Sequence, residues 1–126
     1  MSPPRKESCT AVREVLNRVG DKWSVYVVGA LSDGPMRFNA LKRSIDGISQ
    51  RMLTFTLKSL EQDGLVTRTV YPTVPARVDY ELTRMGLTLL EPVQALVEWA
   101  QVHQPAIHAA RERHRKKQEK ALKAAS

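Results

Sequence analysis

Apolar residues recur at intervals of three and four over the first third of the chain, which is typical of amphipathic helices. Residues 9–19 carry one such stripe, which Gly20 ends, and residues 22–31 carry a second, more continuously apolar one that Asp21 can cap. The turn at 33–35 and the break at 46–47 bound a third, short helical pattern over residues 37–44. The pattern therefore predicts three closely spaced helices, of which the second is central to the core.

A fourth helix is predicted between Ser49 and Gly64. Ser49 is a good N-cap, and Ile48 and Leu53 have the spacing of a hydrophobic staple. Gly64 suits the residue that follows a helix end. At 100° per residue the leucines of this helix share one side. The opposite side carries polar, cationic and aromatic residues, namely Gln50, Arg51, Thr54, Phe55 and Lys58.

Two β-propensity runs, 66–71 and 77–82, follow this helix. In the second run Val78, Tyr80 and Leu82 alternate with polar residues, and the residues between the runs form a proline-rich hairpin tip. The combination predicts a mainly α fold with a small antiparallel β-hairpin, which is a winged helix-turn-helix.

From residue 83 a long helical stripe extends to about residue 100, and it contains more apolar surface than a small core requires. Pro92 is expected to kink or divide this helix. After Pro105 the chain becomes alanine-rich and basic. We therefore expect an N-terminal arm over 1–8, one winged helix-turn-helix domain over 9–104, and a basic C-terminal tail over 105–126, either helical or frayed.

The chain of 126 residues has a formal net charge of +7, and the distribution of that charge along the sequence is informative. Residues 37–77 contain seven basic and three acidic residues, and the tail 111–126 contains seven basic and two acidic residues. The remainder is slightly acidic, so the positive charge of the globular part belongs to the predicted helix-turn-helix and wing. A phosphate polymer is the natural partner of such a surface.

Several classes of protein are disfavoured by the sequence. The single cysteine and the three scattered histidines do not reproduce a zinc-ligand spacing, so we expect no metal and no cofactor. Catalytic motifs are absent, which argues against an enzyme. The apolar stretches are too short for a membrane span, and the N-terminus lacks the apolar segment of a secretory signal. A cytoplasmic location is expected.

The predicted fold assigns DNA contacts to specific residues. Ser49, Gln50, Arg51, Thr54 and Lys58 offer donors and acceptors to base edges and phosphates in the major groove. Phe55 either contacts a thymine methyl group or packs within the protein, and the sequence leaves both open. Arg68 and Arg77 flank the wing, where each either grips the minor groove or is a solvated strand charge, with a neighbouring acid as a possible partner for Arg77.

Cys9 lies where the first helix is predicted to begin. Helix amides lower the pKa of a thiol at such a position, and Arg5, Lys6 and Arg13 are near in sequence. Cys9 is therefore either a reactive sensor or an inert, partly buried thiol.

Three segments closely resemble HxlR-type winged helix-turn-helix transcriptional regulators, which are relatives of the MarR group. They are Gly20-Asp-Lys-Trp23, the segment from Asp33 to Arg68 with its I-S-Q-R-M-L opening of the fourth helix, and the Y-P-x-V-P-x-R-V-x-Y wing. The resemblance covers roughly residues 9 to 100. Phe55 stands where a polar residue is usual.

The resemblance implies a bacterial homodimer, assembled through the first and last helices, that binds a pseudo-palindromic operator and most often represses transcription. It also implies that Cys9 occupies the position at which several members sense quinones, aldehydes or hypochlorite. Two alternatives remain open. One is a small-molecule effector pocket at the dimer interface near Trp23 and Trp99, and the other is an adaptor that uses the winged fold to bind proteins.

Overall fold

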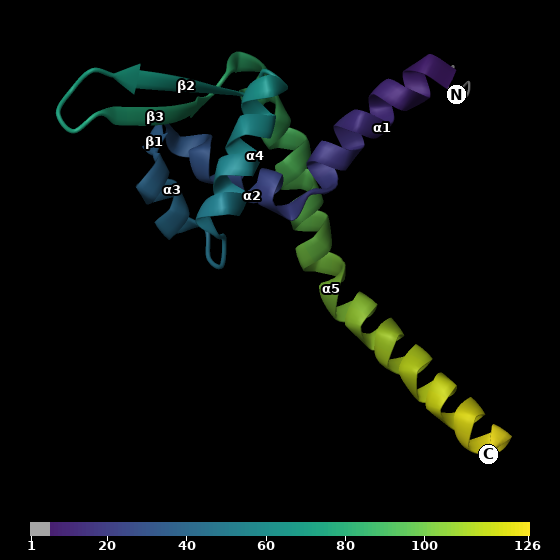
Figure 1. The fold of residues 1–126 in the computed structure, drawn as a ribbon. Helices are drawn as coiled ribbons and strands as arrows, with labels where there is room; N and C mark the ends of the chain where they lie inside the picture. Colours follow the sequence, from purple (N-terminus) through teal and green to yellow (C-terminus); the bar gives the residue numbers. More distant parts are fainter. Residues whose placement is uncertain (1–5) are drawn as a thin grey trace. The chain divides into compact units, whose positions relative to one another are not determined.

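The computed structural model describes residues 6–126, although the side chains of residues 6–9, 19 and 20 lie outside that description. Most of the expected N-terminal arm, residues 1–5, is therefore outside it as well. The elements follow one another as α1 (Lys6–Gly20), α2 (Lys22–Ala30), the 3-10 turn η1 (Leu31–Asp33), β1 (Met36–Arg37), α3 (Phe38–Ser44), α4 (Gln50–Gln62), β2 (Val66–Tyr71), β3 (Arg77–Leu82) and α5 (Arg84–Ala125) (Figure 1). A mainly helical winged helix-turn-helix is confirmed.

The chain divides into two compact units, Met1–Val93 and Gln94–Ser126. The first unit contains the helix-turn-helix, the sheet and the first turns of α5, and the second is the remainder of α5. The tail, for which helix and frayed chain were both open, is helical to Ala125, and α5 is assigned without interruption through Pro92 and Pro105. Among the described residues, no helix has an apolar stretch long enough to span a membrane.

The core of the first unit lies between α2, α3, α4 and the sheet. Its fully buried apolar side chains are Val27, Val28, Leu31, Leu41, Leu53, Leu57, Leu60 and Val66, and the leucines of α4 are the ones that the sequence pattern placed on a shared side. Ile48 belongs to the same cluster as Leu53, as the hydrophobic staple requires. Burial of these leucines fixes the rotation of α4 about its axis, and its other face is consequently left toward solvent.

The sheet has three strands rather than the two that the sequence predicts. Strand β3 is central, with β2 on one side and the two-residue β1 on the other, and Met36 pairs with Tyr80. Arg37, expected in the third helix, is instead a β1 residue and occupies the N-cap position of α3 without a side-chain hydrogen bond. A two-residue strand has no periodicity to detect, so only its pairing with β3 reveals it.

Asp79 departs from the expected alternation of β3. It stands among the polar positions of the strand, yet it is only 8% exposed. It is flanked on both sides, since it pairs with Arg37 of β1 and Thr69 of β2. Asp79 therefore belongs to a central strand, whereas a simple two-stranded hairpin would place it in an edge strand.

Candidate nucleic-acid interface

Helix α4 is fixed at both ends by hydrogen bonds that its own sequence supplies. The hydroxyl of Ser49 accepts a hydrogen bond from the backbone N–H of Met52 at 3.0 Å, which is an N-cap. At the other end Gly64 has φ +75°, and the N–H groups of Gly64 and Leu65 donate to the carbonyls of Glu61 and Leu60. This is a Schellman motif. Both predicted helix ends are confirmed.

The exposed side of α4 brings together five of the predicted DNA-contacting residues. They line one shallow hollow at the surface: Gln50, Arg51, Thr54, Phe55 and Lys58. Phe55 is 61% exposed, so it does not pack in the core of its own chain. Among the described residues, no ion pair involves Arg51 or Lys58, whereas the Thr54 hydroxyl donates to the carbonyl of Gln50 at 2.8 Å. Two unpaired cations therefore flank an aromatic ring on this face.

The end of α4 is tied to α1 by one ion pair. Arg18 Nε lies 2.6 Å from a carboxylate oxygen of Asp63, which is the C-cap of α4. Both side chains are partly exposed, so the pair adds little stability.

Arg77, at the start of β3, is held by its own strand. Its guanidinium makes two hydrogen bonds to Asp79, of 3.0 and 2.8 Å, and lies over the ring of Tyr71 at 5.1 Å. The hydrogen bonds to Arg77 lower the pKa of Asp79, although burial opposes this, and the same contact raises the pKa of Arg77. The acidic partner that the sequence left open is present. The guanidinium remains partly exposed at the wing.

Arg68 is the second arginine of the wing, on β2. Its Nε lies 3.9 Å from a carboxylate oxygen of Glu61, and both side chains are about half exposed. A contact of this length between exposed groups is weak, so Arg68 is free to turn toward another anion.

Two residues position Arg77: Asp79, the acid that sequence reasoning allowed for but did not name, and Tyr71, which it missed. The i, i+2 spacing of Arg77 and Asp79 on one strand face is a signal that could have found the carboxylate. Tyr71 pairs with Arg77 across the hairpin, and only the strand register shows this.

Cys9 lies in the first turn of α1, which begins at Lys6, three residues before the predicted start. Its side chain is outside the described part of the structure. Among the described residues no group of three histidine, cysteine or acidic side chains could hold a metal ion.

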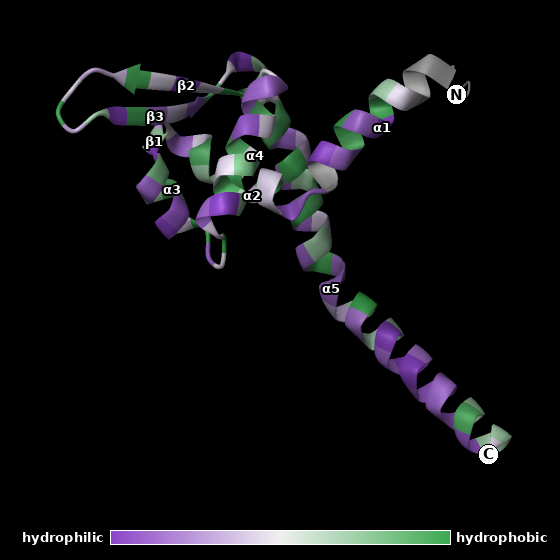
Figure 2. Ribbon diagram, in the orientation of Figure 1, coloured by the Kyte–Doolittle hydropathy of each residue, from purple (hydrophilic) through white to green (hydrophobic). Residues whose placement is uncertain are grey.

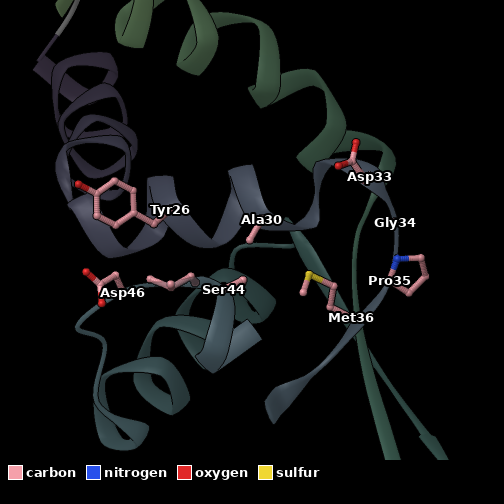
Figure 3. A pocket seen from close by; sticks show the side chains of 9 residues that line it. Tyr26, Ala30, Asp33, Gly34, Pro35, Met36, Ser44 and Asp46 are labelled. Atoms are coloured by element: carbon pink, nitrogen blue, oxygen red, sulfur yellow. The ribbon is translucent and has the colours of Figure 1, made fainter. Parts of the chain in front are cut away.

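An open pocket of about 730 Å³ lies beside α2, away from the residues of the α4 face (Figure 3). Tyr26, Ala30 and Met36 contribute to its wall, and Asp33 and Asp46 lie at opposite ends of it. Neither Trp23 nor Trp99 lines this pocket. Trp23 packs edge-on against Tyr26, and Trp99 stacks on His103.

Comparison with known proteins agrees with this geometry. The family described as HxlR-like helix-turn-helix matches residues 18–108. The chain belongs to this family. The HxlR-like match includes α2, α3, α4 and the whole wing, and so all the residues placed at the interface above.

Proteins similar to this chain are described as regulators. The uncharacterized HTH-type transcriptional regulator YtfH of Escherichia coli (strain K12) is 42% identical over 106 residues, which cover 84% of this chain and 83% of YtfH. The redox regulator HypR in its reduced form has a TM-score of 0.73 at 38% identity, covering 79% of this chain and 98% of that one. The reduced transcriptional regulator YodB from Bacillus subtilis has a TM-score of 0.64 at 37% identity, covering 79% and 92%.

The protein is therefore a transcriptional regulator of the helix-turn-helix type. DNA binding follows from the family, and the exposed face of α4 with the adjoining wing is the surface that suits it.

Proposed function

We propose that the protein is a sequence-specific regulator, and more specifically a repressor, that acts in the cytoplasm and binds a pseudo-palindromic operator as a homodimer. In this proposal α4 enters the major groove, where Gln50 and Arg51 read base edges and Phe55 contacts a thymine methyl group. Ser49, Thr54 and Lys58 contact phosphates or base edges. Arg68 and Arg77 follow the minor groove beside the wing.

The observation that carries the proposal is the composition of the exposed side of α4. A helix whose buried side is held by three leucines presents an amide, a hydroxyl and two unpaired cations to solvent over a single surface hollow. A helix that served only to cover the core would have no need of unpaired cations around an exposed aromatic ring. Recognition helices of helix-turn-helix proteins have this composition.

Replacing Arg51 with alanine tests the assignment. Loss of a bidentate contact to guanine should weaken binding to the specific site by about 1 to 3 kcal/mol, with a smaller effect on random duplex. The specific duplex is obtained by selection of random-sequence DNA with the parent protein. Fluorescence anisotropy titrations then compare parent and variant on both duplexes.

The matched control is Arg84→Ala, which removes one exposed positive charge outside the α4 face. It should leave the preference for the selected duplex unchanged. Equal affinity of the parent and Arg51→Ala for the selected site would refute the role of Arg51. Failure of the parent to bind any duplex would instead favour the protein-binding adaptor.

The regulator is also proposed to respond to oxidants or electrophiles through Cys9. Two observations support this: Cys9 lies in the first turn of α1, where helix amides lower a thiol pKa, and the similar protein HypR is a redox regulator. Because the chain has a single cysteine, a disulfide could only form with a second molecule.

Replacing Cys9 with serine should abolish the response of DNA binding to hypochlorite or diamide. The reduced parent and Cys9→Ser should bind the selected duplex equally well before treatment. Gel-shift titrations before and after oxidation measure the change. An oxidant response that persists in Cys9→Ser would overturn the sensor role. If the parent itself shows no oxidant response, a non-covalent effector is favoured, for which the pocket beside α2 is one candidate cavity.

A further inference from the structure

The C-terminal part of α5 carries a one-sided band of positive charge. Taking 100° per residue, five cations fall within an arc of about 120° over a length of about 15 Å. We call them the C-terminal basic stripe: Arg113, Lys116, Lys117, Lys120 and Lys123. All five are exposed, and Figure 2 shows this stretch of α5 as mainly hydrophilic.

The two carboxylates of this segment do not neutralise the stripe. Glu112 and Glu119 both pair with Arg115, with N–O distances of 2.9 and 2.6 Å. Arg115 lies on the opposite side of the helix, and the two glutamates lie between Arg115 and the edge of the stripe. Among the described residues, no ion pair involves any member of the stripe. In the structure both carboxylates are therefore engaged by Arg115 and not by the stripe, and these ion pairs also stabilise the helix.

We propose that the C-terminal basic stripe binds the phosphate backbone of duplex DNA without reading its sequence. Duplex DNA carries about one negative charge per 1.7 Å of its axis, so a row of cations of this length can meet several phosphates. Four of the five residues are lysines, which act as point charges on flexible stems and need no defined base edge opposite them. The stripe shares no residue with the α4 face and lies wholly beyond residues 18–108, which the family matches.

The chemistry of the rest of this helix segment favours DNA over a membrane. A helix that lies on an anionic bilayer needs an apolar face opposite its cations. Here the opposite side carries Arg111, Arg115 and Gln118, with Leu122 as its one large apolar residue. The segment also lacks the aromatic residues that anchor protein interfaces. Compared with a membrane or a protein surface, the solvent-exposed phosphates of duplex DNA match the charge of the stripe best.

This inference rests on the proposed function only in that DNA is already the partner of the protein. The stripe would add sequence-independent affinity, whereas the α4 face would supply the preference for an operator. The two contributions are separable because random duplex reports the first and the difference between selected and random duplex reports the second.

The test uses the full chain with all five stripe residues replaced by glutamine, a good helix former that removes charge. Binding to random-sequence duplex is followed by anisotropy across a salt series. The slope of log affinity against log salt should fall by about 0.9 for each phosphate that the variant no longer neutralises, a total of about 2 to 4, and affinity at low salt should drop about tenfold or more. Circular dichroism confirms that the helix content is retained.

Two matched controls separate the effect of this particular row of cations from the effect of total positive charge. Exchanging lysine and arginine at all five positions keeps the charge and should preserve parent-like binding. Lys120→Gln, at the centre of the stripe, should reduce the slope more than Arg111→Gln, which removes one charge from the opposite side. Equal effects of these two would show diffuse attraction and would overturn a defined stripe.

If the five-glutamine variant has the same salt dependence on random duplex as the parent, the stripe proposal is refuted. This holds whether or not Arg51→Ala weakens binding to the selected duplex. Conversely, loss of operator preference in Arg51→Ala with a normal stripe effect would leave both proposals intact. Vesicles of phosphatidylserine and phosphatidylcholine provide the remaining arm. A stripe-dependent binding to vesicles without any stripe-dependent binding to DNA would reject the nucleic-acid partner.

Discussion

Two glycines fix the joint between α4, the wing and α5. Gly64 provides the positive φ that ends α4, and Gly86 allows the first turn of α5 to approach the backbone of Leu65. Thr83 completes the joint, because its hydroxyl donates to the carbonyl of Gly64 at 2.6 Å and accepts from the N–H of Gly86 at 3.0 Å. A Cβ on Gly86 would overlap the carbonyl oxygen of Leu65.

Gly86→Ala should therefore destabilise the fold by about 2 kcal/mol. The new methyl group would overlap the carbonyl oxygen of Leu65, which is a backbone atom and cannot change rotamer to relieve the overlap. Urea unfolding at one fixed protein concentration measures the loss. The control is Gly29→Ala, because a Cβ on Gly29 meets nothing within 4 Å. It should be neutral or stabilising by about 0.5 kcal/mol. Equal effects of the two substitutions would contradict the close approach.

At the scale of the element, α4 shows how much local sequence can decide. Its N-cap, its hydrophobic staple and its closing glycine are all adjacent to the helix in sequence, and all three lie where the pattern predicts them. The rotation of the helix follows from its leucines. Helical periodicity was therefore sufficient to group Gln50, Arg51, Thr54 and Lys58 on one side, whereas the exposure of Phe55 required the folded chain.

Ser49 combines two roles that one substitution can separate. It caps α4 and, as we propose, also contacts DNA. Ser49→Asp keeps an equally good cap and should preserve the free energy of unfolding to within about 0.5 kcal/mol. It places a negative charge on the DNA face, however, and should weaken binding to the selected duplex at least about tenfold. Denaturant unfolding and anisotropy measure the two effects.

Ser49→Ala is the companion variant, which loses the cap without adding charge. It should cost about 1 kcal/mol of stability. If Ser49→Asp bound the selected duplex as tightly as the parent does, the N-terminus of α4 would have to lie away from the phosphates.

For the whole molecule, the exposed apolar residues of α1 are the main unexplained surface. Val12, Val15 and Leu16 have the three- and four-residue spacing of a single face, and each is more than half exposed. On α5, Leu96, Trp99 and Val102 are similarly exposed. Surfaces of this kind on a small protein usually belong to an interface. They support the proposed homodimer, in which each buried side chain contributes about 1.5 to 3 kcal/mol.

Leu16→Glu should therefore convert the dimer to a folded monomer, because burying a carboxylate in an apolar interface is costly. Analytical ultracentrifugation measures the mass, and circular dichroism reports the fold. Affinity for a two-site operator should fall, since each monomer then binds a half-site independently.

Asn17→Glu introduces the same charge on another face of α1 and should leave the dimer intact. A dimer that survives Leu16→Glu would exclude this face of α1 from the interface.

The sequence by itself indicated four helices and their approximate positions, the N-caps of α2 and α4, the wing and the buried face of α4, because periodicity, caps and turns depend on residues that are near one another in the chain. Only the tertiary structure decided the third strand, the burial of Asp79 beneath Arg77, and the need for glycine at position 86. Each of these depends on a contact between segments distant in sequence. Met36 gives no sign of a strand until β3 lies beside it, and Gly86 resembles any helical glycine until Leu65 is placed against it.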